Sequence, residues 1–410
     1  MTQRNSVDHA AMRDMNLALI LNTLRSESPL SRAALANTTG LNKATVSSMV
    51  KELIQNNLVR EIGADVSSSD VGRPAINLEP DPEAGYIIGL EIGVDFISII
   101  TVNFAIEVVA RRFESTAKYF SQEAILDRVL FLLQESYEQV LKRGRPLFGI
   151  GVGVPGLVDV ASGTLLFAPN LNWRDLPLRD MIRSAIHVHV YLANEANLAA
   201  LGESYFGAGQ ESDSLLYVSS GVGLGGGIVL NGRLIEGASG FAGEVGHMTV
   251  EKDGLECNCG NRGCWETLAS QRALFRRVAE ALQQGQPSWM ASMIEDDPSR
   301  ISIPLIMEAA RREDPVALRA LTETGEWLGI GIAGLMNAIN PQRVIFGGPL
   351  WTVHQYLLPS IRETVAQRAW HWVQKGVQII PAMNGEDAAV MGAVAIVYRD
   401  VLNKPRRWLE

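Results

Sequence analysis

The chain opens with apolar residues at the spacing of an amphipathic helix. The apolar positions of residues 16–24 are Leu17, Ile20, Leu21 and Leu24. They predict one helix with a buried face. Two further helices are expected after it, because Ser31 and Asn42 carry the short polar side chains that cap helix N-termini.

The segment around these two caps has the pattern of a helix-turn-helix. Ala36 provides a small residue where two helices touch, Gly40 a turn, and Val46 an apolar anchor on the second helix. Basic and small hydroxyl residues on the first turns of that second helix suit entry into the major groove of DNA. The residues expected to face inward are Val46, Met49, Val50 and Leu53. Those left facing out are Lys43, Ala44, Thr45, Ser47, Ser48 and Lys51.

A two-stranded wing is expected to follow the second helix. Residues 58–62 and 75–78 read as its strands and residues 65–70 as its polar tip, with Arg73 beside it for the minor groove. The candidate DNA contacts are Ser31, Arg32, Lys43, Thr45, Ser47, Ser48, Lys51 and Arg73. The alternative is an ordinary three-helix bundle whose exposed face binds nothing.

Beyond Glu79-Pro-Asp-Pro-Glu83 the pattern changes to apolar strands punctuated by glycine and alternating with amphipathic helices. Strand hairpins are expected over 86–102 and over 215–230, which predicts two similar α/β lobes and a weak internal duplication. A further strand is expected over 187–192. The expected helices cover residues 122–143, 197–206, 309–340 with an interruption at Pro315, and 388–400.

Composition and charge narrow the class of protein. The 410 residues are 47% hydrophobic and 20% charged, which excludes a disordered chain. The net charge is −9, yet residues 1–80 carry eight basic and eight acidic residues, so the negative charge belongs to the rest. The first 80 residues can therefore bind a polyanion such as DNA, although the whole chain is acidic. No apolar run reaches about 18 residues and the start has no secretory pattern, so we expect a cytoplasmic protein without membrane insertion.

All three cysteines of the chain lie within residues 257–264. In the order His247, Cys257, Cys259, Cys264 they match the three-thiolate, one-imidazole ligand set of a closed zinc site. We expect one structural zinc ion per chain, because four protein ligands leave no open position. A redox loop or buried free thiols are the alternatives.

Several polar residues of the body suggest a cleft for a small ligand. The glycine-rich stretch 219–227 is of the kind that cradles phosphate. Amides and carboxylates on nearby loops suit a neutral sugar, whose hydroxyls both donate and accept hydrogen bonds. These residues are Asn170, Asn194, Glu195, Glu244, His247 and Glu266. Taken singly, each has another explanation: a plain turn, a helix cap at Asn194-Glu195, or a carboxylate that orients a metal ligand.

At these residues the chain resembles the ROK family (repressors, open reading frames, kinases), in its repressor branch, near the xylose-operon repressors. The most specific segments are Gly240–His247 and Cys257–Glu266. The resemblance implies a winged helix-turn-helix, mainly α with a β-wing, followed by a two-lobed α/β actin-like, sugar-kinase (ribonuclease H-like) fold. It implies domains at 1–80, 81–194 joined by 388–410, and 195–387. It also implies that Asn170, Asn194, Glu244, His247 and Glu266 contact sugar.

The chain departs from the kinases of that family at the phosphate side. Glu91-Ile-Gly93-Val-Asp95-Phe96 lacks the second glycine, threonine and lysine of the ATP-binding turn. Val222 stands where a threonine is usual, and Glu195 replaces the aspartate base. The longer side chain of Glu195 would move the carboxylate by roughly a methylene length, and a displacement of about 1 Å in a catalytic group can lower a rate about 100-fold. We therefore expect no enzyme activity and no bound ATP.

The resulting expectation is a sugar-responsive transcriptional repressor. A homodimer, or a dimer of dimers, would bind operator DNA through its winged helices and sense a neutral monosaccharide, with xylose favoured and glucose next. The alternatives are an ATP-dependent sugar kinase with an added DNA-binding domain, and a regulator controlled by a protein partner.

Overall fold

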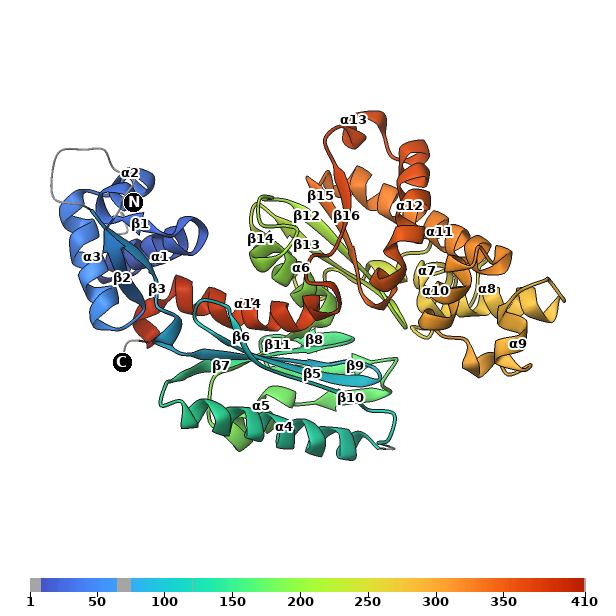
Figure 1. Ribbon diagram of the computed structural model, residues 1–410, viewed down its shortest axis with the longest axis horizontal. Coiled ribbons are helices and arrows are strands. Elements are labelled where there is room, and N and C mark those ends of the chain that lie inside the picture. Colours follow the sequence, from blue (N-terminus) through green and yellow to red (C-terminus); the bar gives the residue numbers. More distant parts are fainter. Residues whose placement is uncertain (1–8, 65–74, 120, 409–410) are drawn as a thin grey trace, which may run out of the picture.

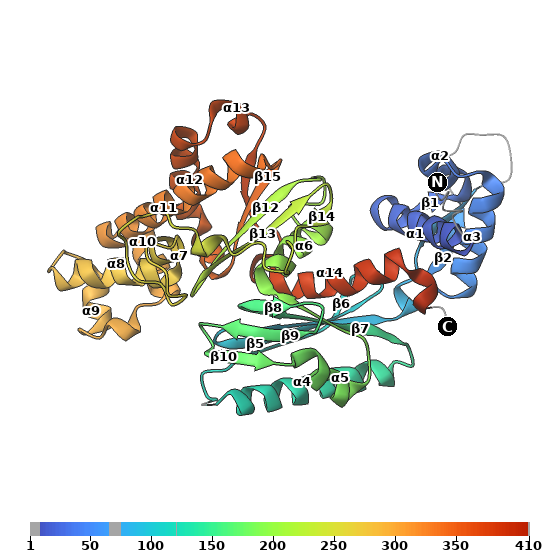
Figure 2. The same ribbon diagram turned by 180° about the vertical axis from the view of Figure 1, so that it is seen from behind.

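Three packed regions follow one another along the chain, in the order that the sequence predicts (Figure 1). The computed structural model describes residues 9–64, 75–119 and 121–408. A small helical region at the N-terminal end leads into two α/β lobes, and the last long helix returns to lie between them (Figure 2).

The N-terminal region is a winged helix-turn-helix, as predicted. Both predicted caps are confirmed: the Ser31 side chain accepts a hydrogen bond from the Ala34 amide, and that of Asn42 from the Thr45 amide. Gly40 ends the second helix in the left-handed conformation (φ 71°), which glycine adopts without strain. The elements are α1 (His9–Glu27), β1 (Leu30–Ser31), α2 (Arg32–Thr39), α3 (Lys43–Gln55), β2 (Val59–Ala64) and β3 (Ile76–Pro80), with the strands ordered β1-β3-β2.

The first lobe is built on a five-stranded sheet of order β11-β7-β4-β5-β6. Helices α4 and α5 cover one face of this sheet and α14 the other (Figure 1). A three-stranded sheet, β10-β9-β8, lies beside it. The bounds are β4 (Tyr86–Ile92), β5 (Phe96–Asn103), β6 (Val108–Ser115), α4 (Gln122–Lys142), β7 (Leu147–Val154), β8 (Leu157–Asp159), β9 (Thr164–Ala168), β10 (Trp173–Leu176), α5 (Leu178–Ile186) and β11 (Val190–Asn194).

The second lobe has a five-stranded sheet of order β14-β13-β12-β15-β16. Along β12, Leu215 and Tyr217 face the helix α6, while Leu216 and Val218 face the core around α11. The bounds are α6 (Glu195–Phe206), β12 (Leu215–Ser220), β13 (Leu224–Leu230), β14 (Arg233–Leu234), α7 (Glu266–Ala269), α8 (Gln271–Gln283), α9 (Met290–Ile294), α10 (Ile303–Arg311), α11 (Pro315–Ile339), β15 (Arg343–Gly347), α12 (His354–Arg368), α13 (His371–Gln374), β16 (Gln378–Pro381) and α14 (Ala388–Asn403).

The predicted internal duplication is confirmed by the two large sheets. In each lobe the first strand pairs antiparallel with the second and parallel with the fourth, and the fifth strand continues parallel beyond the fourth. The third strand extends the other edge, beside the second. Both sheets therefore have the same strand order and directions.

One expected strand was wrong in its first residue, and one expected helix interruption is confirmed. The expected strand over 187–192 begins only at Val190, because His187 ends α5 in the left-handed conformation (φ 57°). The expected helix over 309–340 is two helices, and the predicted interruption at Pro315 is confirmed as the start of α11. Among the described residues, the helices are too short or too polar to cross a bilayer.

Candidate functional site

The exposed face of α3 carries the polar residues that the sequence assigns to DNA. Its apolar residues Val46, Met49, Val50 and Leu53 are buried. Lys43, Ser47, Ser48 and Lys51 are exposed on the other side, and Thr45 is half-buried. The helix therefore presents hydroxyl and ammonium groups to solvent, and their contacts with DNA stay a prediction.

Two other candidate DNA contacts are engaged within the domain. Ser31 is buried, and its hydroxyl accepts the Ala34 amide hydrogen bond over 3.2 Å. Its predicted cap is confirmed, because the hydroxyl is held against the helix that it caps, and its contact with DNA stays a prediction. The Arg32 guanidinium donates to the Glu61 carboxylate on β2, 2.8 Å away. Arg73 lies outside the described residues.

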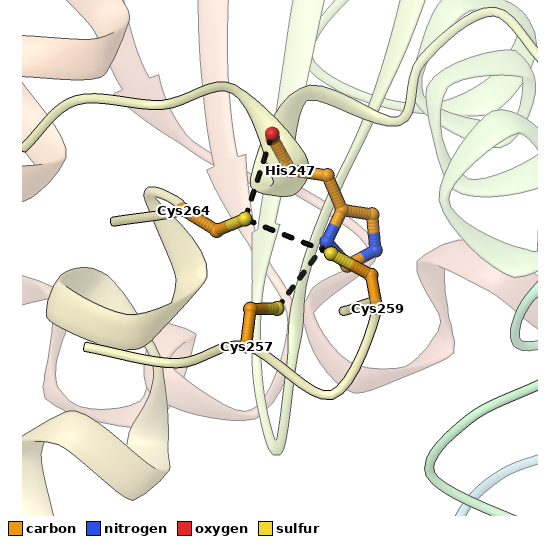
Figure 3. A group of neighbouring side chains, drawn as sticks. All are labelled: His247, Cys257, Cys259 and Cys264. Atoms are coloured by element: carbon orange, nitrogen blue, oxygen red, sulfur yellow. Dashed lines mark hydrogen bonds between the residues drawn. The ribbon is translucent and has the colours of Figure 1, made fainter. Parts of the chain in front are cut away.

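The four predicted metal ligands come together on one loop of the second lobe (Figure 3). Their ligand atoms all lie within 4.8 Å of one another. Cys257 Sγ is 3.6 Å from His247 Nδ1, and Cys259 Sγ is 3.7 Å from Cys264 Sγ. The loop closes because Gly263 takes a left-handed conformation (φ 68°) against the backbone of Glu251. The group could hold a metal ion.

His247 links this cluster to the carboxylate of Glu244. Its Nδ1 faces Cys257, whereas its Nε2 lies 3.8 Å from the Glu244 carboxylate. Burial raises the pKa of Glu244. An imidazole whose Nδ1 binds a metal carries its proton on Nε2, where it can donate a hydrogen bond. One ring can thus serve both the metal cluster and a ligand.

Glu266 connects the metal loop with the glycine-rich hairpin. Its Oε2 accepts a hydrogen bond from the Leu224 amide over 3.2 Å, and its Oε1 lies 3.1 Å from Cys257 Sγ. The preceding Trp265 is fully buried, and its ring N–H donates to the Trp327 carbonyl over 2.7 Å. This anchor fixes the start of α7 and hence the direction of the Glu266 carboxylate.

Asn170 reaches the same point from the first lobe. A Cβ atom placed on Gly223 would lie 2.7 Å from Glu266 Oε2 and 3.0 Å from Asn170 Nδ2. The two polar groups therefore meet over Gly223, one from each lobe, and any side chain at this glycine would separate them. The lobes thus converge at a polar junction.

Asn194 and Glu195 start α6 at the end of β11. The Asn194 oxygen accepts hydrogen bonds from the amides of Ala196 and Asn197, and its amide donates to the Gly156 carbonyl over 3.1 Å. The alternative interpretation as a helix cap is confirmed for Asn194, which keeps one N–H for a ligand. Glu195 Oε2 is buried and has no hydrogen-bond partner among the residues that the structure describes. Burial, aided by the Glu244 and Glu91 charges, raises the pKa of Glu195 to about 8.

Sequence reasoning missed two buried polar side chains, Glu91 and Asn197, which the structure places close to Asn194 and Glu195. Asn197 donates to the Ala242 carbonyl over 3.1 Å, and within the described part of the chain its own oxygen accepts no hydrogen bond. Glu91, at the end of β4, is buried with its Oε2 unpartnered. Asn197 follows Asn194 by almost one helical turn, and this spacing was the available signal. Nothing in the local sequence marks Glu91 as buried.

Replacing Glu91 by glutamine is expected to flatten the pH dependence of thermal stability. Burial, with the Asp387 charge as the smaller cause, raises the pKa of Glu91 from 4.5 to about 8. Between these pH values the folded chain holds a proton that the unfolded chain has released, so the free energy of unfolding falls as pH rises. Glu91→Gln should therefore raise the melting temperature at pH 8 and change it little at pH 5. Melting curves that keep the original pH dependence would contradict this, and Glu138→Gln on the exposed face of α4 is the control.

The turn between β4 and β5 is covered by an aromatic ring. A Cβ atom on Gly93 would collide with the ring of Phe96. That ring stacks on Phe113, with centroids 5.3 Å apart. Asp95 is exposed at the same turn. The Gly93 N–H donates to the Phe96 carbonyl over 2.8 Å, so this N–H group is already engaged within the turn.

Comparison with known proteins agrees with this architecture. The pattern of the ROK family matches residues 87–400, and that of a winged helix-turn-helix DNA-binding domain matches residues 18–60. The xylose repressor of Caldicellulosiruptor bescii is 36% identical over 402 residues, which cover 97% of this chain and 99% of the relative.

Two solved structures resemble the whole chain or its lobes. A ROK family transcriptional regulator, a homolog of the E. coli MLC protein, has a TM-score of 0.83 at 28% identity and covers 97% of this chain and 99% of its own. A ROK family glucokinase from Streptomyces griseus, in complex with glucose and AMPPNP, has a TM-score of 0.67 at 33% identity. The match covers 76% of this chain and 99% of the glucokinase chain. The chain described here belongs to the ROK family.

Proposed function

We propose that this protein is a transcriptional repressor that binds operator DNA through its winged helix and releases it in response to a neutral sugar. The observation that carries the proposal is that one chain combines the exposed polar face of α3 with amide and carboxyl groups that meet from both lobes over Gly223. A family relative at 36% identity over nearly the full length is a xylose repressor.

The chemistry of the cleft favours an uncharged ligand. Its candidate residues offer carboxyl, amide and imidazole groups, and within the described part of the chain none of them is hydrogen-bonded or ion-paired to a lysine or arginine. A phosphorylated sugar needs such cations. Xylose is the first candidate, and glucose is the second because it occupies the related glucokinase.

The metal of the cysteine loop is proposed to be zinc, one ion per chain. A tetrahedral zinc ion with ordinary bond lengths separates two sulfur atoms by about 3.8 Å and a sulfur from a nitrogen by about 3.6 Å. The distances of 3.7 and 3.6 Å in the cluster fit these values. The residues that would hold zinc are His247, Cys257, Cys259 and Cys264. Bound there, it would supply no reaction chemistry and would fix the loop that carries His247 and Glu244.

Phosphoryl transfer is not part of the proposed function. The reaction depends on positioning the phosphates and neutralising their charge. Here the Gly93 N–H is hydrogen-bonded to the Phe96 carbonyl, Asp95 adds a negative charge at the turn, and Val222 offers no hydroxyl donor. The likeness to a glucokinase favours a sugar kinase as the second candidate function.

Repression by this chain requires two copies on a palindromic operator. We propose a homodimer, or a dimer of dimers, in which the angle between lobes sets the positions of the two α3 helices. Sugar shifts the equilibrium only as far as it binds one arrangement more tightly than the other. A protein partner acting in place of the sugar is the third candidate.

Calorimetric titration of the purified protein is the direct test. We expect heat of binding with xylose or glucose, and less with N-acetylglucosamine 6-phosphate than with N-acetylglucosamine. Glu195→Ala should weaken binding at least about 10-fold, because sugar hydroxyls lose a buried partner. Glu195→Gln should stay within about threefold, because an amide replaces a protonated carboxyl group with similar donor and acceptor capacity.

Glu138→Ala, an exposed change on α4, is the matched control for these variants. A coupled assay for ADP with the same sugars separates the candidates. Turnover at ordinary kinase rates, on the order of 1–100 per second, would overturn the proposal in favour of the kinase. Binding of none of the sugars would favour the partner-controlled regulator.

A further inference from the structure

Helices α6 and α14 pack against each other but belong to different lobes. α14 lies on β4 and β7 of the first sheet, whereas α6 packs mainly on β12 and β13 of the second. Their backbones touch: a Cβ atom on Gly202 would lie 2.6 Å from the Ala388 carbonyl oxygen. A change in the angle between the lobes must therefore move α6 relative to α14.

Helix α1 of the winged helix packs on α14, and the side chain of its Arg25 reaches α6. On the α14 side, Asn22 Nδ2 lies 3.4 Å from Asn403 Oδ1, and Arg406 Nη1 lies 3.4 Å from Asp14 Oδ1. On the α6 side, the guanidinium carbon of Arg25 lies 5.0 Å from the ring centroid of Tyr205. The position of α1 thus depends on where α6 and α14 stand relative to each other.

The contact with α6 is sensitive to geometry. Arg25 is half-buried, and its Nε is buried without a hydrogen-bond acceptor in the described parts of the chain. The ring face of Tyr205 is therefore an important partner of this side of the guanidinium, and such a contact strengthens when water is excluded. Tyr205 stands at one end of α6, and Glu195 of the cleft stands at the other.

We propose that the Arg25–Tyr205 contact couples the sugar cleft to the winged helix, with α6 as the rigid element between them. The inference rests on the proposed function, because it needs a sugar that alters operator binding. Arg25 and Tyr205 are positioning residues: they touch neither sugar nor DNA. A ligand that draws the lobes together moves α6, and the contact transfers that movement to α1.

The test measures operator affinity by fluorescence anisotropy with and without saturating xylose, and again with glucose. The DNA is a duplex selected from random sequence by the unmodified protein. For Arg25→Met, we expect sugar affinity and sugar-free operator affinity to stay within about threefold. The ratio of operator affinities without and with sugar should fall by about 10-fold, because the variant keeps the apolar stem but loses the cation.

Further variants separate coupling from folding. Tyr205→Leu should reproduce Arg25→Met, and the double variant should be no worse than either single one. Tyr205→Phe and Arg25→Lys keep a ring and a cation and should retain most of the response. Arg312→Met removes a comparable cation–ring contact with Trp289 (4.4 Å) far from α1, and should change nothing.

One outcome would contradict the coupling through Arg25 and Tyr205, and another would contradict the sugar-responsive function. An unchanged ratio in Arg25→Met, with the unmodified protein responding to sugar, would overturn the coupling and leave the proposed function intact. The absence of any effect of either sugar on operator binding by the unmodified protein would overturn the sugar-responsive function itself, and the coupling with it.

Discussion

Replacing Cys257 and Cys259 together by serine is expected to remove the bound zinc and abolish the response to sugar. The double change leaves His247 and Cys264, and two ligands do not hold a structural zinc ion. Without the ion, the loop that carries Glu244 and His247 loses the bond that fixes it. Elemental analysis should give about one zinc per unmodified chain and none in the variant, and titration should show lost sugar binding.

Asn258→Ser is the matched control, because Asn258 is exposed between the two cysteines. It should keep both zinc and sugar affinity. Unmodified protein purified without chelator and free of zinc would refute the metal assignment. A zinc-free variant that still binds sugar with full affinity would instead refute the dependence of the cleft on the loop.

Introducing one negative charge on the exposed face of α3 is expected to abolish operator binding. Ser47 is exposed near the start of this helix, so Ser47→Glu would bring a carboxylate against the phosphates. Most binding free energy comes from neutralised phosphates, and we expect a loss of more than about 100-fold. Sugar affinity should not change. Ser292→Glu, an exposed change on α9 of the second lobe, should leave operator binding intact.

Ser47→Glu is a cleaner test than deletion of the winged helix. The domain shares one apolar core with the first lobe, in which Leu17 and Leu21 of α1 pack with Val397 and Val401 of α14. Deletion would expose that core. Full operator affinity in Ser47→Glu, measured over a range of salt concentrations, would show that α3 does not read the DNA.

Local chemistry decided which parts of the structure were predictable. The caps at Ser31 and Asn42 and the turn at Gly40 were readable because each depends on a few neighbouring residues. The metal cluster was readable because every cysteine of the chain belongs to it. Ser31 fits two roles, because helix caps and phosphate contacts favour the same small hydroxyl residue, and the structure shows the first of them.

The cleft was predictable only in part. Their residue types brought Asn170 and Glu266 into one sugar-binding hypothesis, which the resemblance to the ROK family then supported, and the structure brings them together over Gly223. Glu91 and Asn197 escaped notice because burial and missing partners arise from tertiary packing. The raised pKa of Glu195 likewise depends on burial and on the charges of Glu91 and Glu244, which become its neighbours only when the chain folds.

The core that joins α1 to α14 also bears on the spacing of operator half-sites. The winged helix is attached to the lobes by packed side chains, with α1 in contact with α14, the last long helix. We therefore expect it to be unable to rotate far enough to reach a half-site on another side of the duplex. In the proposed dimer, inserting about five base pairs, half a helical turn, between half-sites would turn one of them to the far side of the duplex. The operator affinity of such a repressor should therefore depend on the helical phase between the half-sites as strongly as on their base sequence.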